Sequence, residues 1–157
     1  MRTLRQRSMV GAAVLLGAVA VVVAGCGSSP GSGSPGEPAA VLTVSGAVTG
    51  SVTGASPVCH TGSGAVSVSI SGTLAGHSFL FATQVQPYHG SGTYPISASG
   101  SGASVVLQVG TDAYGPGAHP GQVTVANGGH SGTVAGSFSA TSPAVGNLTV
   151  AGSWACR

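Results

Sequence analysis

Strict alternation between apolar and hydroxyl-bearing residues is the feature that most constrains the fold of this chain. In AVSVSIS, at residues 65–71, the apolar side chains point to one side of an extended chain and the serines point to the other. The same alternation recurs in SVVLQV at 104–109, QVTVA at 122–126 and NLTVAGSWAC at 147–156. A period of two residues indicates β-strands with one buried face.

Clusters of Gly, Pro, Asn and Ser separate these runs and predict turns. They lie at residues 54–57, 88–92, 99–102, 114–121, 127–130 and 142–147. No segment after the N-terminal region has a helical period. We therefore expect an all-β fold, an antiparallel β-sandwich of roughly eight or nine short strands over residues 41–157, with a barrel as the alternative.

Two segments resemble each other, SGTLAGHSFLFAT at 71–83 and SGTVAGSFSAT at 131–141. Their similarity has two interpretations. One is a duplicated pair of strands. The other is chance similarity, which is common in a chain so rich in Gly, Ser and Thr.

The N-terminus has the order of a secretory signal. MRTLRQR carries three arginines, and residues 9–25 that follow contain no charged side chain. A transmembrane helix is the alternative, but it needs about 20 apolar residues, and this run is shorter. The run ends in Val23-Ala24-Gly25-Cys26, which resembles a bacterial lipobox: an aliphatic residue, two small residues and a cysteine. That resemblance implies cleavage of residues 1–25 and attachment of diacylglycerol and acyl chains such as palmitate to Cys26, which would hold the protein on a membrane.

A tether and an almost uncharged domain follow the lipobox cysteine. Residues 26–40 are dominated by Gly, Ser and Pro, a composition that predicts a flexible linker. Beyond residue 25, the charged side chains are Glu37, Asp112 and Arg157, so the net charge of +2 arises from the signal. Without a basic patch, we expect no nucleic-acid partner.

The two other cysteines are expected to form one disulfide. Cys59 and Cys156 permit a single intramolecular pairing in an exported chain, where thiols are not kept reduced. Cys156 shares the face of Trp154 and Val150, so the alternation places it towards the interior of the sandwich.

The whole layout resembles the mycobacterial 19 kDa lipoprotein antigen family. The carriers of the resemblance are the lipobox, the tether, VTGASPVC at 52–59, SGTVAG at 131–136 and VAGSWAC at 150–156. Membership would imply a membrane-anchored surface antigen whose acylated N-terminus is sensed by innate immune receptors. The family carries no established catalytic residues.

Catalytic machinery is hard to assemble from these residues. A glycosidase needs paired carboxylates, and the folded part has Asp112 alone. The one GxSxG pattern, Gly27–Gly31, lies in the tether with no helix after it. A Ser-His-Asp triad would have to use Asp112 with one of the five histidines. We therefore expect no enzyme activity and no catalytic residue.

The histidines and aromatic residues are the remaining candidates for a site. No HxH or CxxC spacing joins His60, His77, His89, His119 and His130, so we expect no metal site and no cofactor; His77 and His130 are the best placed if one exists. Four aromatic residues, Phe79, Phe81, Phe138 and Trp154, could line a lipid pocket, but a small domain needs them to fill its core.

Two functions are compatible with the sequence. We favour a non-enzymatic lipoprotein on the outer face of the cell membrane, acting as a surface antigen or as a binding or structural module of the envelope. The alternative is a carrier of an apolar ligand such as a lipid. The membrane is the only partner that the sequence indicates.

Overall fold

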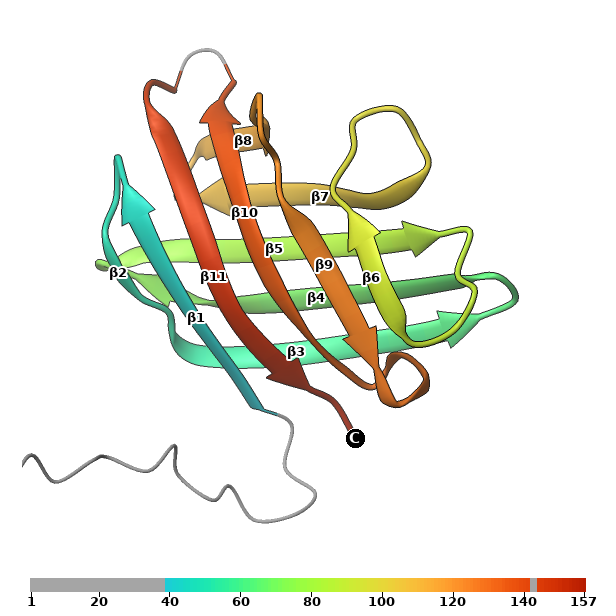
Figure 1. The fold of residues 1–157 in the computed structure, drawn as a ribbon. Helices are drawn as coiled ribbons and strands as arrows, with labels where there is room; N and C mark the ends of the chain where they lie inside the picture. Colours follow the sequence, from blue (N-terminus) through green and yellow to red (C-terminus); the bar gives the residue numbers. More distant parts are fainter. Residues whose placement is uncertain (1–38, 142–143) are drawn as a thin grey trace, which may run out of the picture. The chain divides into compact units, whose positions relative to one another are not determined.

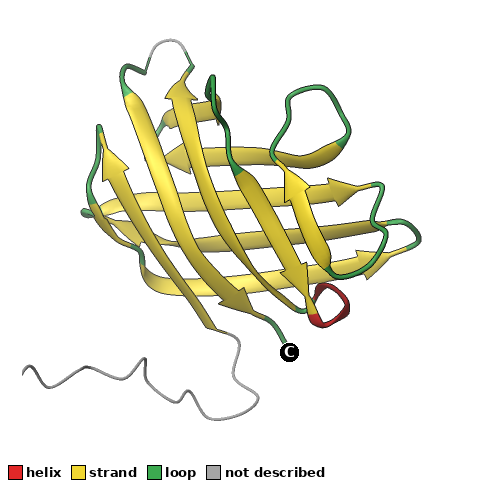
Figure 2. Cartoon of the chain, viewed as in Figure 1, coloured by secondary structure: helices red, strands yellow, loops and turns green. Residues whose placement is uncertain are grey.

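The structure, a computed structural model, describes residues 39–141 and 144–157. The predicted signal, Cys26 and most of the tether lie outside these residues. The first strand begins at Ala39, just before the predicted start of the domain at residue 41. Figure 2 shows that strands dominate, and a short 3-10 turn at Asn127–Gly129 is the one helical element of the described part.

Eleven strands form the described domain. They are β1 (Ala39–Gly46), β2 (Gly50–Ser51), β3 (Thr53–Gly62), β4 (Ala65–Leu74), β5 (His77–Gln86), β6 (Gly92–Pro95), β7 (Gly102–Val109), β8 (Asp112–Pro116), β9 (Gln122–Ala126), β10 (Ser131–Ala140) and β11 (Asn147–Ala155). Neighbouring strands run antiparallel in the order β2-β1-β11-β10-β8-β7-β5-β4-β3, and β6 and β9 extend the sheet from β10.

This sheet folds over into two layers, which confirms the predicted antiparallel sandwich. Figure 1 shows β1, β11, β10, β9 and β6 in one layer, with β3, β4, β5 and β7 crossing behind them at a steep angle. At one corner, the C-terminal end of β10 leaves β9 and pairs with β8 of the other layer. At the opposite corner, β2 continues almost directly into β3. There the backbone N–H of Val52 donates to the carbonyl oxygen of Leu42, with 2.9 Å between the nitrogen and the oxygen. These two corners give the sandwich a barrel-like outline.

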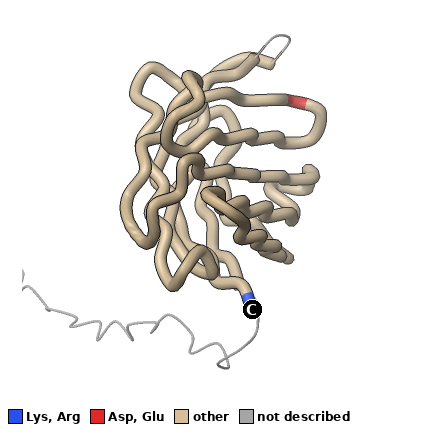
Figure 3. The backbone as a smooth tube through the Cα atoms, turned by 90° about the vertical axis from the view of Figure 1, so that its right-hand side faces the viewer, with Lys and Arg blue, Asp and Glu red and all other residues tan. Residues whose placement is uncertain are grey.

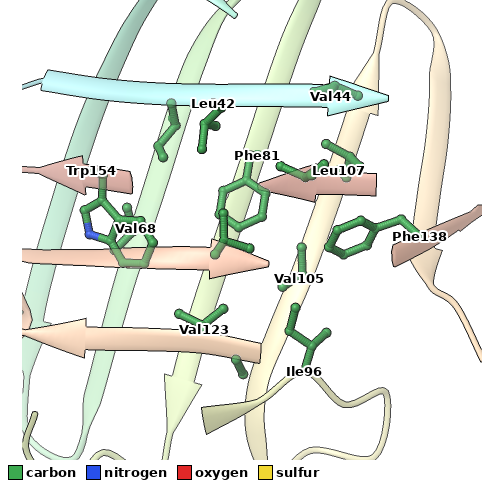
Figure 4. Packing of buried hydrophobic residues seen from close by; sticks show 14 of the residues in the cluster. Leu42, Val44, Val68, Phe81, Ile96, Val105, Leu107, Val123, Phe138 and Trp154 are labelled. Atoms are coloured by element: carbon green, nitrogen blue, oxygen red, sulfur yellow. The ribbon is translucent and has the colours of Figure 1, made fainter. Parts of the chain in front are cut away.

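The core lies between the layers and contains the apolar side chains that the alternation placed on one face. Phe81 and Phe138 are its largest fully buried residues, and Trp154 is 3% exposed. Figure 4 shows the indole of Trp154 beside Val68, with Phe81 in the middle of the cluster. Burial of such side chains contributes about 1.5–3 kcal/mol each and is the main favourable term in a domain with so few charges.

The structure has more strands than expected because β2 and β6 are too short for their alternation to be recognised. In addition, β8 overlaps the turn predicted at residues 114–121, so that prediction is wrong at residues 114–116. The turn predicted at residues 54–57 is wrong: these residues belong to β3 and contain a register shift between Thr53 and Ser56. Pro57 fits there because β3 is the last strand of its layer, and proline is tolerated in edge strands and beside bulges.

The similar segments at 71–83 and 131–141 adopt different structures, so the duplicated strand pair is wrong. The first segment forms the hairpin of β4 and β5, where Leu74 pairs with His77 across Ala75 and Gly76. Both turn residues have positive φ, as a tight two-residue hairpin requires. The second segment instead runs straight through β10.

Candidate functional site

The predicted disulfide between Cys59 and Cys156 is confirmed. Cys59 lies on β3 at the edge of one layer, and Cys156 directly follows β11 of the other. Their Cα atoms are 6.0 Å apart, and the bridge spans 97 positions of sequence. Both cysteines are partly buried and pack against the core. The bridge therefore links the edge strand of one layer to the C-terminal strand of the other.

The five histidines occupy separate exposed positions. His60 lies on β3, His77 begins β5, and the other three lie in loops or turns. A ring nitrogen of His130, Nδ1, lies 3.2 Å from the main-chain oxygen of Arg157. Within residues 39–141 and 144–157, no three His, Cys, Asp or Glu side chains gather as a metal site would require.

The aromatic residues proposed for either a core or a lipid pocket belong to the core. Phe79, Phe81, Phe138 and Trp154 are each at most 3% exposed and contribute to one continuous apolar cluster. Their side chains fill the interior of the domain and do not line a pocket there. Two hollows that could hold a ligand lie on the outer surface of the described domain.

The larger of these two hollows lies on the outer face of β3, β4, β5 and β7. It has a volume of about 260 Å³, and its lining includes His60, Ser67, Ser69, Ala82, Gln84 and Val106. The register between the four strands explains why these residues lie together. His60, Ser67, Gln84 and Ser104 form one row across the four strands, and Val58, Ser69, Ala82 and Val106 form the next row on the same face. Short side chains on β4 and at the middle of β5 lie between longer ones, and this difference in length makes the hollow.

A second hollow, of about 130 Å³, continues the first along β5. It is lined by Gln84, Gln86, Gly100, Gly102 and Ser104, so the two hollows share Gln84 and Ser104. We call the two together the β5 groove. Its course follows β5 from Ala82 towards Gln86 and the loop before β7.

Some polar side chains that line the β5 groove hydrogen bond within the protein, and others do not. The hydroxyl of Ser104 donates to the carbonyl of Gln84 at 3.3 Å, and the Gln84 amide lies 3.5 Å from the Gln86 oxygen. His60, Ser67 and Ser69 make no side-chain hydrogen bond within the described part of the chain. A ligand in the groove could therefore meet both donors and acceptors.

No charged residue lines the β5 groove. The described part of the chain has two charged side chains, Asp112 at the start of β8 and Arg157 at the C-terminus, and Figure 3 shows how isolated they are on the backbone. One ionisable group elsewhere is perturbed: burial, and then the nearby carboxylate of Asp112, raises the pKa of Tyr114. The groove itself can offer only dipoles and apolar contacts to a ligand.

Sequence reasoning identified the disulfide but not the groove. His60 was considered as a metal ligand or a triad histidine, Ser67 and Ser104 lay on the polar faces of predicted strands, and Gln84 was not considered. Each strand segment alone shows which face a side chain takes. The register between strands, which brings these residues into one row, is visible only in the folded sheet.

Comparison with protein-family models, curated proteins and solved structures finds no match for this chain. The resemblance to the mycobacterial 19 kDa lipoprotein antigen family thus stays a prediction. The described residues include no helix whose length and apolarity would allow it to cross a membrane.

Proposed function

We propose that this protein is an extracytoplasmic lipoprotein, held on the outer face of the cell membrane by lipid on Cys26. Its β domain acts as a non-enzymatic surface antigen or as a binding or structural module of the envelope. The observation that carries the proposal is the combination of the Val23–Cys26 motif with a domain closed by a disulfide. Disulfides persist in oxidising compartments outside the cytosol, and the lipobox addresses a chain to such a compartment.

The tether and the surface of the domain support the same proposal. A linker of the composition and length of residues 26–40 reaches about 20 Å, which would lift the domain off the lipid headgroups. The described surface lacks a basic patch, so attraction to anionic lipid would add little, and membrane attachment would depend on the acyl chains. The absence of paired carboxylates from the β5 groove gives no basis for proposing hydrolysis there.

Replacement of Cys26 tests the anchor. We expect the Cys26→Ala variant, made in a host that acylates lipoproteins, to carry no lipid and to retain or miscut residues 1–25, so that it no longer migrates like the parent. A variant that has lost the apolar run of residues 9–25 should also leave the detergent phase. The intact mass of the parent should in turn match a chain that starts at Cys26 and carries the acyl chains. A variant that lacks Cys59 and Cys156 is the matched control, because it also loses cysteines but should stay in the detergent phase. If Cys26→Ala partitions and migrates like the parent, the lipobox interpretation is wrong.

The alternative is a carrier of an apolar ligand in the envelope. The four aromatic residues that could have lined its pocket are packed in the core, so we retain the binding module as the main proposal. Native mass spectrometry of protein from its own host separates the two functions, because a co-purified lipid would favour the carrier.

A further inference from the structure

The β5 groove lies over the middle of a layer, where the backbone is already hydrogen bonded. β4 pairs with β3 and β5, and β5 pairs with β4 and β7. A peptide that binds by adding a strand needs an exposed sheet edge with unpaired N–H and C=O groups. Recognition in the β5 groove must therefore come from side chains, and these define the chemistry of the ligand.

Those side chains suit a neutral molecule that carries many hydroxyl groups. Gln84 offers an amide, His60 an imidazole, and Ser67, Ser69 and Ser104 offer hydroxyls, which together donate and accept hydrogen bonds. No charged residue lines the groove, so a charged ligand would lose its hydration without gaining a partner of opposite sign. Beside these groups, Val106 is 54% exposed and forms an apolar patch for the C–H groups of a sugar ring.

The shape of the groove suits a chain and not an enclosed small molecule. Pockets that enclose small ligands measure about 300–1,000 Å³, and each hollow of the groove is smaller. The two hollows share Gln84 and Ser104 and follow one another along β5. A linear ligand could occupy both in succession, with consecutive units passing over the shared residues.

We propose that the β5 groove binds a neutral polysaccharide chain. His60, Gln84 and Ser104 hydrogen bond with sugar hydroxyls, and Val106 packs against a ring face. This inference assigns a ligand class to the proposed binding module of the envelope. It rests on that proposed function, because the envelope is the place where the domain would meet such a polymer. Recognition is weak for each sugar unit, because the groove is open and has no aromatic platform.

Titration of the full lipid-bearing protein with defined oligosaccharides tests the proposal. The protein is kept in a polyoxyethylene detergent, because an alkyl glycoside would compete for the groove. The neutral probes are the tetrasaccharides of α-1,4-glucan, β-1,4-glucan, α-1,6-mannan and chitin, and the acidic probe is tetragalacturonic acid. We expect at least one neutral tetrasaccharide to bind, and to bind more tightly than its disaccharide. The acidic probe should not bind.

Filling the groove should abolish this binding. Ala82→Leu puts a large side chain between Ser69 and Val106, and we expect it to raise the dissociation constant at least tenfold. Ala151→Leu is the matched control, because Ala151 is also outward-facing in the middle of a layer, between Thr43 and Ala135. It should leave the affinity unchanged.

A milder variant covers the case in which Ala82→Leu perturbs the sheet. His60→Ala removes an exposed side chain that makes no hydrogen bond within the described domain, and loss of one hydrogen bond should weaken binding about threefold to tenfold. The proposal is overturned if no neutral tetrasaccharide binds, or if binding is equal in the parent, Ala82→Leu and His60→Ala. It is also overturned if dodecanoate or a Gly-Ser peptide, and no sugar, binds in a way that Ala82→Leu blocks.

The anchor and the groove can fail separately. Sugar binding by a protein whose Cys26 carries no lipid would contradict the anchor and leave the groove intact. A lipid-bearing protein that binds none of the neutral probes would contradict the groove alone.

Discussion

Loss of the Cys59–Cys156 disulfide should remove a large share of the stability of the domain. The bridge closes a loop of 97 positions, and so restricts almost the whole unfolded chain. In the chain-entropy model, a loop of this length contributes about 4.7 kcal/mol at 25 °C. Domains of this size are stable by about 5–15 kcal/mol in total. Ion pairs can compensate for little here, because Asp112 and Arg157 are the only charged side chains of the described residues.

The experiment compares the parent with a variant in which both cysteines are replaced by alanine. We expect the free energy of unfolding, from urea denaturation, to fall by about 4–5 kcal/mol and the melting temperature by about 15–20 °C. Reduction of the parent should have nearly the same effect and should leave the double variant unchanged. This comparison separates the crosslink from the loss of two partly buried sulfur atoms.

Two results would refute the reasoning on the disulfide. Labelling of two free thiols in denatured, non-reduced protein from an exporting host would show that the bridge does not form. A fall of less than about 1 kcal/mol, with the bridge formed in the parent, would show that the restricted loop does not dominate stability.

Two further perturbations follow from burial and charge. Phe81→Ala should lower the free energy of unfolding, measured in urea, by about 3–5 kcal/mol because Phe81 is fully buried. The control Val106→Ala, at a position 54% exposed, should change this free energy by no more than about 0.5 kcal/mol. Similar losses at both positions would contradict the assigned core. Burial and Asp112 raise the pKa of Tyr114 above its usual value of about 10, so the folded state holds this proton more tightly than the unfolded state. The contribution of Tyr114 to stability should therefore be constant below about pH 10 and be lost as the pH rises through the raised pKa. The Tyr114→Phe variant should show a smaller fall in melting temperature between pH 8 and 11.5, and an unchanged slope would assign the fall to other groups.

Much of the fold could be predicted from local patterns. Alternation is a property of a few consecutive residues, so it identified β4, β7, β9 and β11 and the inward face of each before any tertiary contact was known. Residues 65–71 lie in β4 with Val66, Val68 and Ile70 buried, as predicted. The disulfide was predictable for a different reason, because only two cysteines follow Cys26 and they permit one pairing.

Short strands and turns were less predictable because their outcome depends on neighbours that are distant in sequence. Ala75-Gly76 and Ala135-Gly136 are the same dipeptide after similar residues, yet the first forms a hairpin turn and the second continues β10. At Gly136, a Cβ would lie 2.6 Å from the carbonyl oxygen of Pro120, so the extended strand there depends on a close approach by another segment. No local pattern records that contact.

The candidate site belongs to the tertiary structure for the same reason. The sequence by itself determined that Ser67 and Ser104 point outward from their strands, and that a lipobox-like motif precedes a Gly-, Ser- and Pro-rich segment and an almost uncharged domain. Only the folded sheet decided that these side chains form one row with His60 beside a hollow. Strand faces follow from the geometry of a single extended backbone, whereas register follows from hydrogen bonding and packing between strands that the chain connects only through turns.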